Sequence, residues 1–230
     1  MEVAELLELF RLETDDISEP FLWSDAEFFI YLSDAQDTFT RRIGGIADSS
    51  SSITKITFKI NDTFVKYDER ILRIKSAMDD QNRKITLRNS DNFEDNPGMS
   101  DDYGSMVNAG LDDGRTGPLR YLVTDIEEDK IRLYPLPDKA GFIRLYVYRQ
   151  PLNRIVNADS ILEIQSHHHL ALLDWVKYKA FMKQDVETFD QVKAEDMRAT
   201  FEIYASIATR EKATREDRKR TVVYGGVPMV

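Results

Sequence analysis

Three short runs between Pro118 and Pro151 alternate apolar and polar residues. A period of two is typical of strands with one buried face. In the third run, Ile143, Leu145 and Val147 share one face, and the residues between them share the other. A polar segment and a longer segment with two prolines separate the runs, and both fit hairpin turns. The pattern therefore predicts a three-strand antiparallel meander.

Helical spacing of apolar residues occurs in four segments, at 3–12, 24–43, 166–184 and 186–214. The second segment has the clearest boundaries, because Ser24 and Glu27 match a capping box and the glycines at 44–45 match a helix end. In the last segment the expected apolar stripe comprises Phe189, Val192, Met197, Phe201, Tyr204, Ile207 and Ala208. A hairpin of the last two helices, packed on the first two, would bury all four stripes.

Further strands are predicted at 53–60, 67–77 and 84–88. Residues 89–117 are rich in Asp, Asn, Ser and Gly and have no sustained period, which indicates a long loop of the functional or mobile kind. We expect a single domain at 1–209, with a β insert at about 53–150, and a tail at 210–230. The expected fold class is α+β and mainly α: a helical bundle with a small antiparallel β-meander and an extended C-terminal tail.

The composition excludes several classes of function. A net charge of −10 and a pI of about 4.9 argue against general nucleic-acid binding and against an anionic membrane surface. The absence of cysteine excludes disulfides, thiolate metal sites and cysteine nucleophiles. No apolar run approaches the ~20 residues of a membrane span, and an acidic N-terminus does not fit a secretory signal. We expect a soluble protein made in a cytosol-like compartment.

The end of the chain differs in charge from the rest. Residues 210–220 contain six basic and three acidic residues, a net charge of +3, so residues 1–209 carry −13. The chain then ends in the apolar sequence T-V-V-Y-G-G-V-P-M-V. Such a tail is poorly suited to pack as a helix on its own domain. It is therefore either a frayed terminus or a segment held by a partner.

Histidines are confined to the consecutive His167, His168 and His169. Neighbouring side chains on a helix point in different directions, and the i, i+4 spacing of helical zinc ligands is absent. The sequence therefore favours a structural role for these histidines, and it predicts no metal site, no catalytic residue and no cofactor. The motifs of nucleotide-binding loops and of serine hydrolases are absent as well.

Two further chemical hypotheses are less favoured. A hydrolase could use carboxylates of the long loop, namely Asp101, Asp102, Asp112 and Asp113, but the loop lacks the register of a calcium-binding loop. Phe142, Tyr146 and Tyr148, with Arg144 and Arg149, could stack single-stranded bases. Grooves that bind single strands are positive, so a core or subunit-interface role is favoured for this aromatic strand face. An enzyme is therefore not expected.

Several stretches, taken in order, resemble the head-to-tail adaptor (connector) proteins of tailed bacteriophages. The chain from Trp23 to Gln36, W-S-D-A-E-F-F-I-Y-L-S-D-A-Q, is similar to the first core helix of that family. The other similar stretches are R-I-L-R-I-K-S from Arg70, G-P-L-R-Y from Gly117, R-L-Y-P-L-P-D from Arg132, R-L-Y-V-Y-R-Q-P from Arg144 and H-L-A-L-L-D-W-V-K-Y-K-A-F from His169. Each is a packing pattern rather than a chemical site, and the resemblance spans most of the chain.

The resemblance implies a structural virion protein at the head–tail interface, synthesised in the host cytoplasm. It would form a ring of twelve copies that docks on the portal protein, extends the DNA channel and supports a tail or nozzle protein. DNA would pass without sequence-specific binding, and no membrane would be involved. The implied portal-binding residues are Arg215, Arg218, Lys219, Arg220, Val222, Val223, Tyr224, Gly225, Gly226 and Val227. The alternative is a soluble interaction module or assembly chaperone that forms no ring.

Overall fold

The structure of the protein, a computed structural model, describes residues 1–90, 114–185 and 188–217. The chain divides into two compact units. The first, here called the helical unit, comprises Met1–Gly45 and Pro151–Val230, and the second, the sheet unit, comprises Ile46–Gln150. The chain thus leaves the helical unit once, forms the whole sheet unit, and returns.

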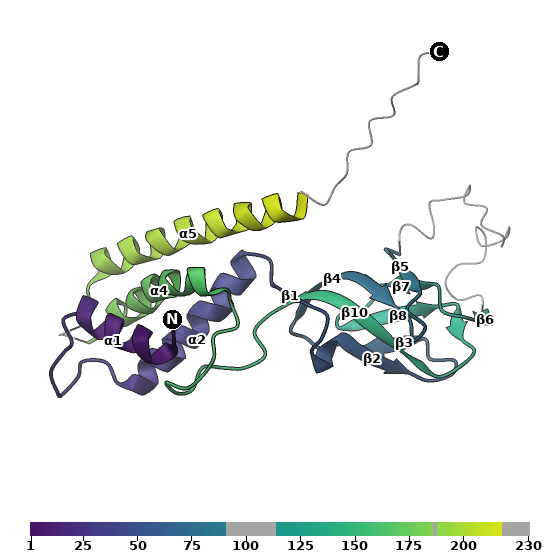
Figure 1. The fold of residues 1–230 in the computed structure, drawn as a ribbon, viewed down its shortest axis with the longest axis horizontal. Helices are drawn as coiled ribbons and strands as arrows, with labels where there is room; N and C mark the ends of the chain where they lie inside the picture. Colours follow the sequence, from purple (N-terminus) through teal and green to yellow (C-terminus); the bar gives the residue numbers. More distant parts are fainter. Residues whose placement is uncertain (91–113, 186–187, 218–230) are drawn as a thin grey trace, which may run out of the picture. The chain divides into compact units, whose positions relative to one another are not determined.

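Four α-helices make up most of the described helical unit (Figure 1): α1 (Val3–Glu13), α2 (Asp25–Arg42), α4 (His169–Phe181) and α5 (Gln191–Asp217). A short 3-10 turn, η3 (Ser166–His168), leads into α4. Helix α4 is central, because it contacts α1, α2 and α5. The core of the unit contains the fully buried rings of Phe10, Phe28, Phe39 and Phe201. Within the described residues, no helix is long and apolar enough to cross a bilayer.

The start of α2 confirms the predicted capping box. The Ser24 hydroxyl accepts a hydrogen bond from the Glu27 N–H at 3.3 Å, and the Glu27 carboxylate accepts one from the Ser24 N–H at 2.9 Å. Two N–H groups that the helix itself leaves unpaired are thereby satisfied. This helix start is therefore determined by residues adjacent in the sequence.

The buried face of α5 differs from the predicted stripe. Its buried residues are Ala194, Phe201, Ala205 and Ala208, three of which are alanines. Val192 and Tyr204, which were expected in the stripe, are 74% and 51% exposed. Small side chains let two helices approach closely, whereas the sequence pattern gives most weight to large apolar residues. The predicted buried face of this helix was therefore wrong, although Phe201 and Ala208 belong both to the predicted stripe and to the observed buried residues.

The sheet unit is built on an eight-stranded mixed sheet. Its strands are β1 (Ile46–Asp48), β2 (Lys55–Phe58), β3 (Phe64–Lys66), β4 (Ile71–Met78), β5 (Lys84–Arg88), β7 (Tyr121–Val123), β8 (Lys130–Tyr134) and β10 (Gly141–Arg149), and a 3-10 turn, η1 (Ser52–Thr54), precedes β2. The order is β1-β10-β4-β5-β7-β8-β3, and β2 also pairs with β10. The β5–β7 pair is parallel. A separate two-stranded sheet joins β6 (Thr116–Gly117) and β9 (Leu136–Pro137).

This sheet shows that the predicted fold class was wrong. The protein is rich in β-sheet and is not a mainly α helical bundle with a small antiparallel meander. The β7–β8 hairpin exists, but β8 neighbours β7 and β3, whereas β10 neighbours β1, β2 and β4. The prediction paired each strand with the next strand in the sequence. The connection between β8 and β10 instead takes the chain to another part of the sheet, so these two strands do not pair. The expected extended tail lies largely outside the described residues.

The face assignment of β10 was correct. Ile143 and Leu145 are fully buried, and Val147 is nearly so. They pack in one apolar cluster with side chains of β5, β7 and β8, which include Ile85, Leu122, Ile131 and Leu133. Burial of each such side chain contributes about 1.5–3 kcal/mol. Strands far apart in the sequence therefore share one core in the sheet unit.

Candidate functional site

Of the ten residues expected to bind the portal, only Arg215 lies within the described residues. It is exposed on the last turns of α5. Its Nη1 donates to Gln165 Oε1 at 3.0 Å, and its Nη2 lies 3.6 Å from a carboxylate oxygen of Glu211. The remaining nine fall outside that part of the chain: Arg218, Lys219, Arg220, Val222, Val223, Tyr224, Gly225, Gly226 and Val227.

The part of α5 that precedes Arg215 is anchored to the end of α2. Lys212 Nζ donates to the carbonyl oxygens of Ile43 at 3.0 Å and Gly45 at 2.5 Å. About one turn earlier, the Thr209 hydroxyl lies 3.3 Å from the Arg42 carbonyl oxygen. Nearly three turns earlier, Glu202 pairs with the Arg42 guanidinium at 2.7 Å. A cation at a helix C-terminus satisfies carbonyls that lack partners and complements the helix dipole. The helix is therefore held on the helical unit immediately before Arg215, the first of the expected portal-binding residues.

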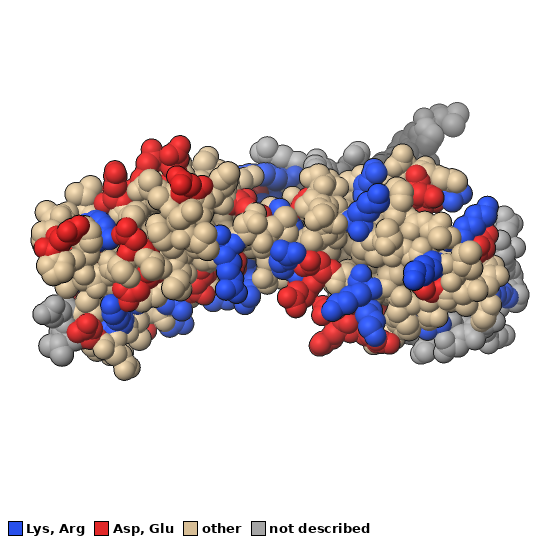
Figure 2. Space-filling view, turned by 90° about the horizontal axis from the view of Figure 1, so that it is seen from below, with Lys and Arg blue, Asp and Glu red and all other residues tan. Residues whose placement is uncertain are grey.

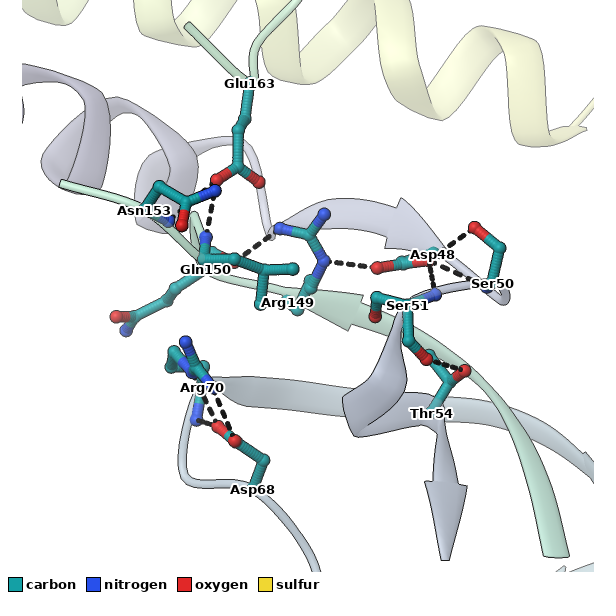
Figure 3. Close-up of polar contacts among 11 residues, drawn as sticks. Asp48, Ser50, Ser51, Thr54, Asp68, Arg70, Arg149, Gln150, Asn153 and Glu163 are labelled. Carbon is teal, nitrogen blue, oxygen red and sulfur yellow. Dashed lines mark hydrogen bonds and ion pairs between the residues drawn. The ribbon is translucent and has the colours of Figure 1, made fainter. Parts of the chain in front are cut away.

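The strands by which the chain enters and leaves the sheet unit lie side by side. Strand β1 begins at Ile46 and pairs antiparallel with the end of β10, with Ile46 opposite Arg149. Figure 3 shows the Arg149 guanidinium and the Asp48 carboxylate pointing toward one another, and they form an ion pair. Their side chains are only 10% and 6% exposed. The pair therefore connects the first and last strands of the unit in a place with little water.

Polar groups around this ion pair satisfy its remaining bonding capacity (Figure 3). The Asp48 carboxylate accepts hydrogen bonds from the N–H groups of Ser50 at 2.9 Å and Ser51 at 3.2 Å, and Arg149 Nη1 donates to the Gln150 carbonyl at 2.9 Å. Burial alone would raise the pKa of Asp48. Hydrogen bonds from Ser51, Arg149 and Ser50 outweigh that effect and hold the pKa of Asp48 well below its usual value.

A lowered pKa of Asp48 predicts sensitivity to acid. The ionised carboxylate stabilises the fold fully above the pKa of an unfolded aspartate, about 3.9, and this contribution is lost as the pH falls through the lower folded-state pKa. In Asp48→Asn the group cannot titrate, so the difference in stability between wild type and variant should shrink from pH 6 toward pH 2. Urea unfolding at a series of pH values measures this difference. A difference that does not change with pH would contradict the assignment.

The chain returns from the sheet unit to the helical unit between Gln150 and Pro151, here called the second crossing. Hydrogen bonds of the helical unit hold the chain just after this point. The Glu163 carboxylate accepts hydrogen bonds from the N–H groups of Leu152 at 2.7 Å and Asn153 at 2.9 Å. The Glu163 N–H in turn donates to Gln36 Oε1 of α2 at 2.7 Å. On the sheet side, the Gln150 N–H donates to the Arg70 carbonyl at 2.8 Å. Both sides of the second crossing are therefore fixed within their own units (Figure 3).

The aromatic strand face is not an open platform for bases. Tyr148 is buried, and the Arg73 guanidinium lies 4.6 Å from its ring centroid. Lys75 Nζ donates to the Tyr148 hydroxyl at 3.3 Å. The Phe142 ring is half-buried, and Lys55 Nζ lies 4.2 Å from its centroid. Side chains of the protein already occupy positions that stacked bases would need, which favours the structural role expected for this face.

The surface charge of the described residues gives no sign of a catalytic site, and most of the acidic loop at 89–117 lies outside those residues. On the face shown in Figure 2, acidic and basic side chains of the described residues are interspersed in small groups. The candidate hydrolase carboxylates, Asp101, Asp102, Asp112 and Asp113, all lie outside the described residues. The most distinctive polar features of the described chain are therefore the Asp48–Arg149 pair, the anchored end of α5 and the histidine turn before α4.

The three histidines of that turn have different surroundings. His169 is buried, and its two ring nitrogens lie 2.9 Å from the Met1 carbonyl oxygen and 3.1 Å from that of Ile164. The rings of His167 and His168 have centroids 3.9 Å apart and lie near Glu211 of α5. The structural role predicted for the cluster therefore fits His169, whereas the other two have polar neighbours that the sequence did not reveal.

Comparison with protein-family models identifies a relationship for this chain. The family model described as SU10 adaptor protein matches residues 1–224. The match therefore includes both units, the whole basic segment at 210–220 and the first four residues of the apolar sequence at 221–230. No curated protein matches the chain significantly.

Proposed function

Because the chain belongs to the SU10 adaptor protein family, we propose that it is the head-to-tail adaptor in the virion of a tailed bacteriophage. Membership in this family makes the chain a structural phage adaptor protein and confirms the family resemblance found in its sequence. The finer proposal is a ring of twelve copies that docks on the portal protein, extends the DNA channel and supports a tail or nozzle protein. Proteins of this family are typically not enzymes.

The proposed portal-binding segment extends from Arg215 to Val227. Its support is the anchoring of α5 through Lys212, which fixes the origin of the segment on the helical unit. The first part is basic and can form ion pairs that orient the tail, and the second part is apolar and can fill a groove on a partner. The segment thus combines the charge and apolar surface that a docking peptide requires.

The exposed face of α5 supports the proposal of a ring. Four large apolar side chains of this helix are substantially exposed: Val192, Ile203, Tyr204 and Ile207. Exposed apolar side chains that gather on one element are typical of protein–protein contacts. In the proposed ring, this face would be covered by a neighbouring copy. The net charge of −10 fits a channel component that lets DNA pass without sequence-specific binding.

Deletion of residues 215–230 is expected to abolish binding to the portal protein while leaving a folded chain. Because the deleted residues follow Lys212, the anchor of α5 is retained. Size-exclusion chromatography with light scattering, on the full chain and the deletion variant each mixed with the portal protein of the same phage, measures complex formation. Circular dichroism of the variant checks that it is folded.

A shorter deletion of residues 228–230 serves as the matched control, because it removes none of the proposed binding residues. The full chain and this control should form a large stoichiometric complex, and the longer deletion should not. Retained binding by the longer deletion would contradict the role of the tail. Failure of the full chain to bind would contradict the adaptor proposal and favour the interaction module or assembly chaperone.

A further inference from the structure

We propose that His167, His168 and Glu211 form a binding site for a divalent transition-metal ion, with Zn²⁺ as the best fit. Ring nitrogens of the two histidines and a carboxylate oxygen of Glu211 all lie within 4.8 Å of one another. Two imidazoles and one carboxylate are a common set of zinc ligands, and water completes the tetrahedron. The family description assigns no metal, so this site goes beyond the proposed function.

The fold brings together ligands that the sequence pattern separates. The sequence argument assumed that the histidines lie on a regular helix and sought a further ligand at i, i+4 on it. Instead, His167 and His168 belong to the 3-10 turn η3, where their rings lie close together and tilted, with an angle of 50° between their planes. The third ligand comes from α5, which packs against α4 and carries Glu211 to the turn.

One ligand of the site is held in place and two can adjust. The half-buried ring of His168 packs against the fully buried Phe39, with ring centroids 5.2 Å apart. His167 and Glu211 are exposed. Zinc bonds of about 2.0–2.2 Å place tetrahedral ligand atoms about 3.3 Å from one another, so the ligand atoms of these two side chains must close by up to about 1.5 Å. Exposed side chains make such movements through ordinary rotamer changes.

Glu211 supplies the negative charge of the proposed site, and a basic neighbour competes for it. Arg215 is the competing cation, because it lies 3.6 Å from Glu211. When the metal takes Glu211, Arg215 keeps its hydrogen bond to Gln165.

Isothermal titration of the tag-free full chain with ZnCl₂ tests the site, and Co²⁺ absorption reports its coordination. We expect one Zn²⁺ per chain, an absorption spectrum of tetrahedral Co²⁺, and a melting temperature that rises with Zn²⁺ concentration, as mass action requires. His167→Ala and Glu211→Gln should each weaken Zn²⁺ binding by at least about tenfold, since even the loss of a group that only supports a metal ligand costs about 10–100-fold. Both residues are exposed, so these variants should fold.

Glu195→Gln is the matched control, because Glu195 is another exposed glutamate of α5. Its Zn²⁺ affinity should equal that of the wild type. Absence of stoichiometric binding by the wild type would overturn the proposal. Equal weakening in Glu195→Gln and Glu211→Gln, or unchanged binding in His167→Ala, would also overturn it, because the bound metal would then lie elsewhere.

Discussion

Replacing Arg149 with methionine is expected to lower the free energy of unfolding by about 3–5 kcal/mol, the usual effect of breaking a buried ion pair by removal of one partner. The substitution leaves the 6%-exposed Asp48 carboxylate without its cation. The hydrogen bonds from Ser50 and Ser51 remain, but they do not neutralise its charge. The first and last strands of the sheet unit would also lose their connecting side-chain contact.

Urea unfolding followed by far-UV circular dichroism measures this loss. The control is Lys130→Met in the same unit, which removes an ion pair with Glu127 whose side chains are 46% and 44% exposed. Exposed pairs contribute about 0–1 kcal/mol. A loss for Arg149→Met as small as that of the control would mean that the Asp48–Arg149 pair does not stabilise the sheet unit.

Replacing Phe201 with alanine is expected to cost about 3–5 kcal/mol, the range for truncating a buried phenylalanine. Phe201 is fully buried, with ring centroids 4.8 Å from Trp175 and 6.0 Å from Phe39. The substitution would leave a cavity between α2, α4 and α5. Tyr204→Ala is the matched control on the same helix, and its cost should be within about 0.5 kcal/mol because Tyr204 is exposed.

Tryptophan emission is a suitable measurement for this pair of variants, because Trp23 and Trp175, the two tryptophans of the chain, both belong to the helical unit. Urea unfolding curves should show a large shift of the midpoint for Phe201→Ala and almost none for Tyr204→Ala. Similar shifts for both variants would favour the apolar stripe predicted from the sequence over the alanine-rich face in the structure.

The family resemblance was recognisable from sequence because it rests on packing patterns in a fixed order rather than on a chemical site. Trp23 to Gln36 forms a capped helix, and Arg144 to Pro151 forms the end of the longest strand and the residues after it. These patterns can be recognised in one sequence because each depends only on the spacing of residues that are close together in the chain. They identify the family, but they do not specify how the elements pair.

The sequence by itself determined local conformation and, in several elements, the buried face. The Ser24–Glu27 capping box fixed a helix start, and alternation correctly placed Ile143, Leu145 and Val147 inside. Hydrogen bonds between near neighbours and a repeating apolar pattern are sufficient for such assignments. The hairpin of β7 and β8 could be predicted for the same reason, since a short turn joins the two strands.

Only the tertiary structure decided which distant segments meet. It placed β5 parallel to β7, β10 beside β4, and Asp48 against Arg149, which are contacts between residues far apart in the chain. It also determined that the alanine-rich face of α5 is buried, and it placed Glu211 near His167. Strand pairing and helix packing depend on the total free energy of the folded chain, which includes contacts and burial shared by distant segments. The local periodicity of one segment does not contain this information.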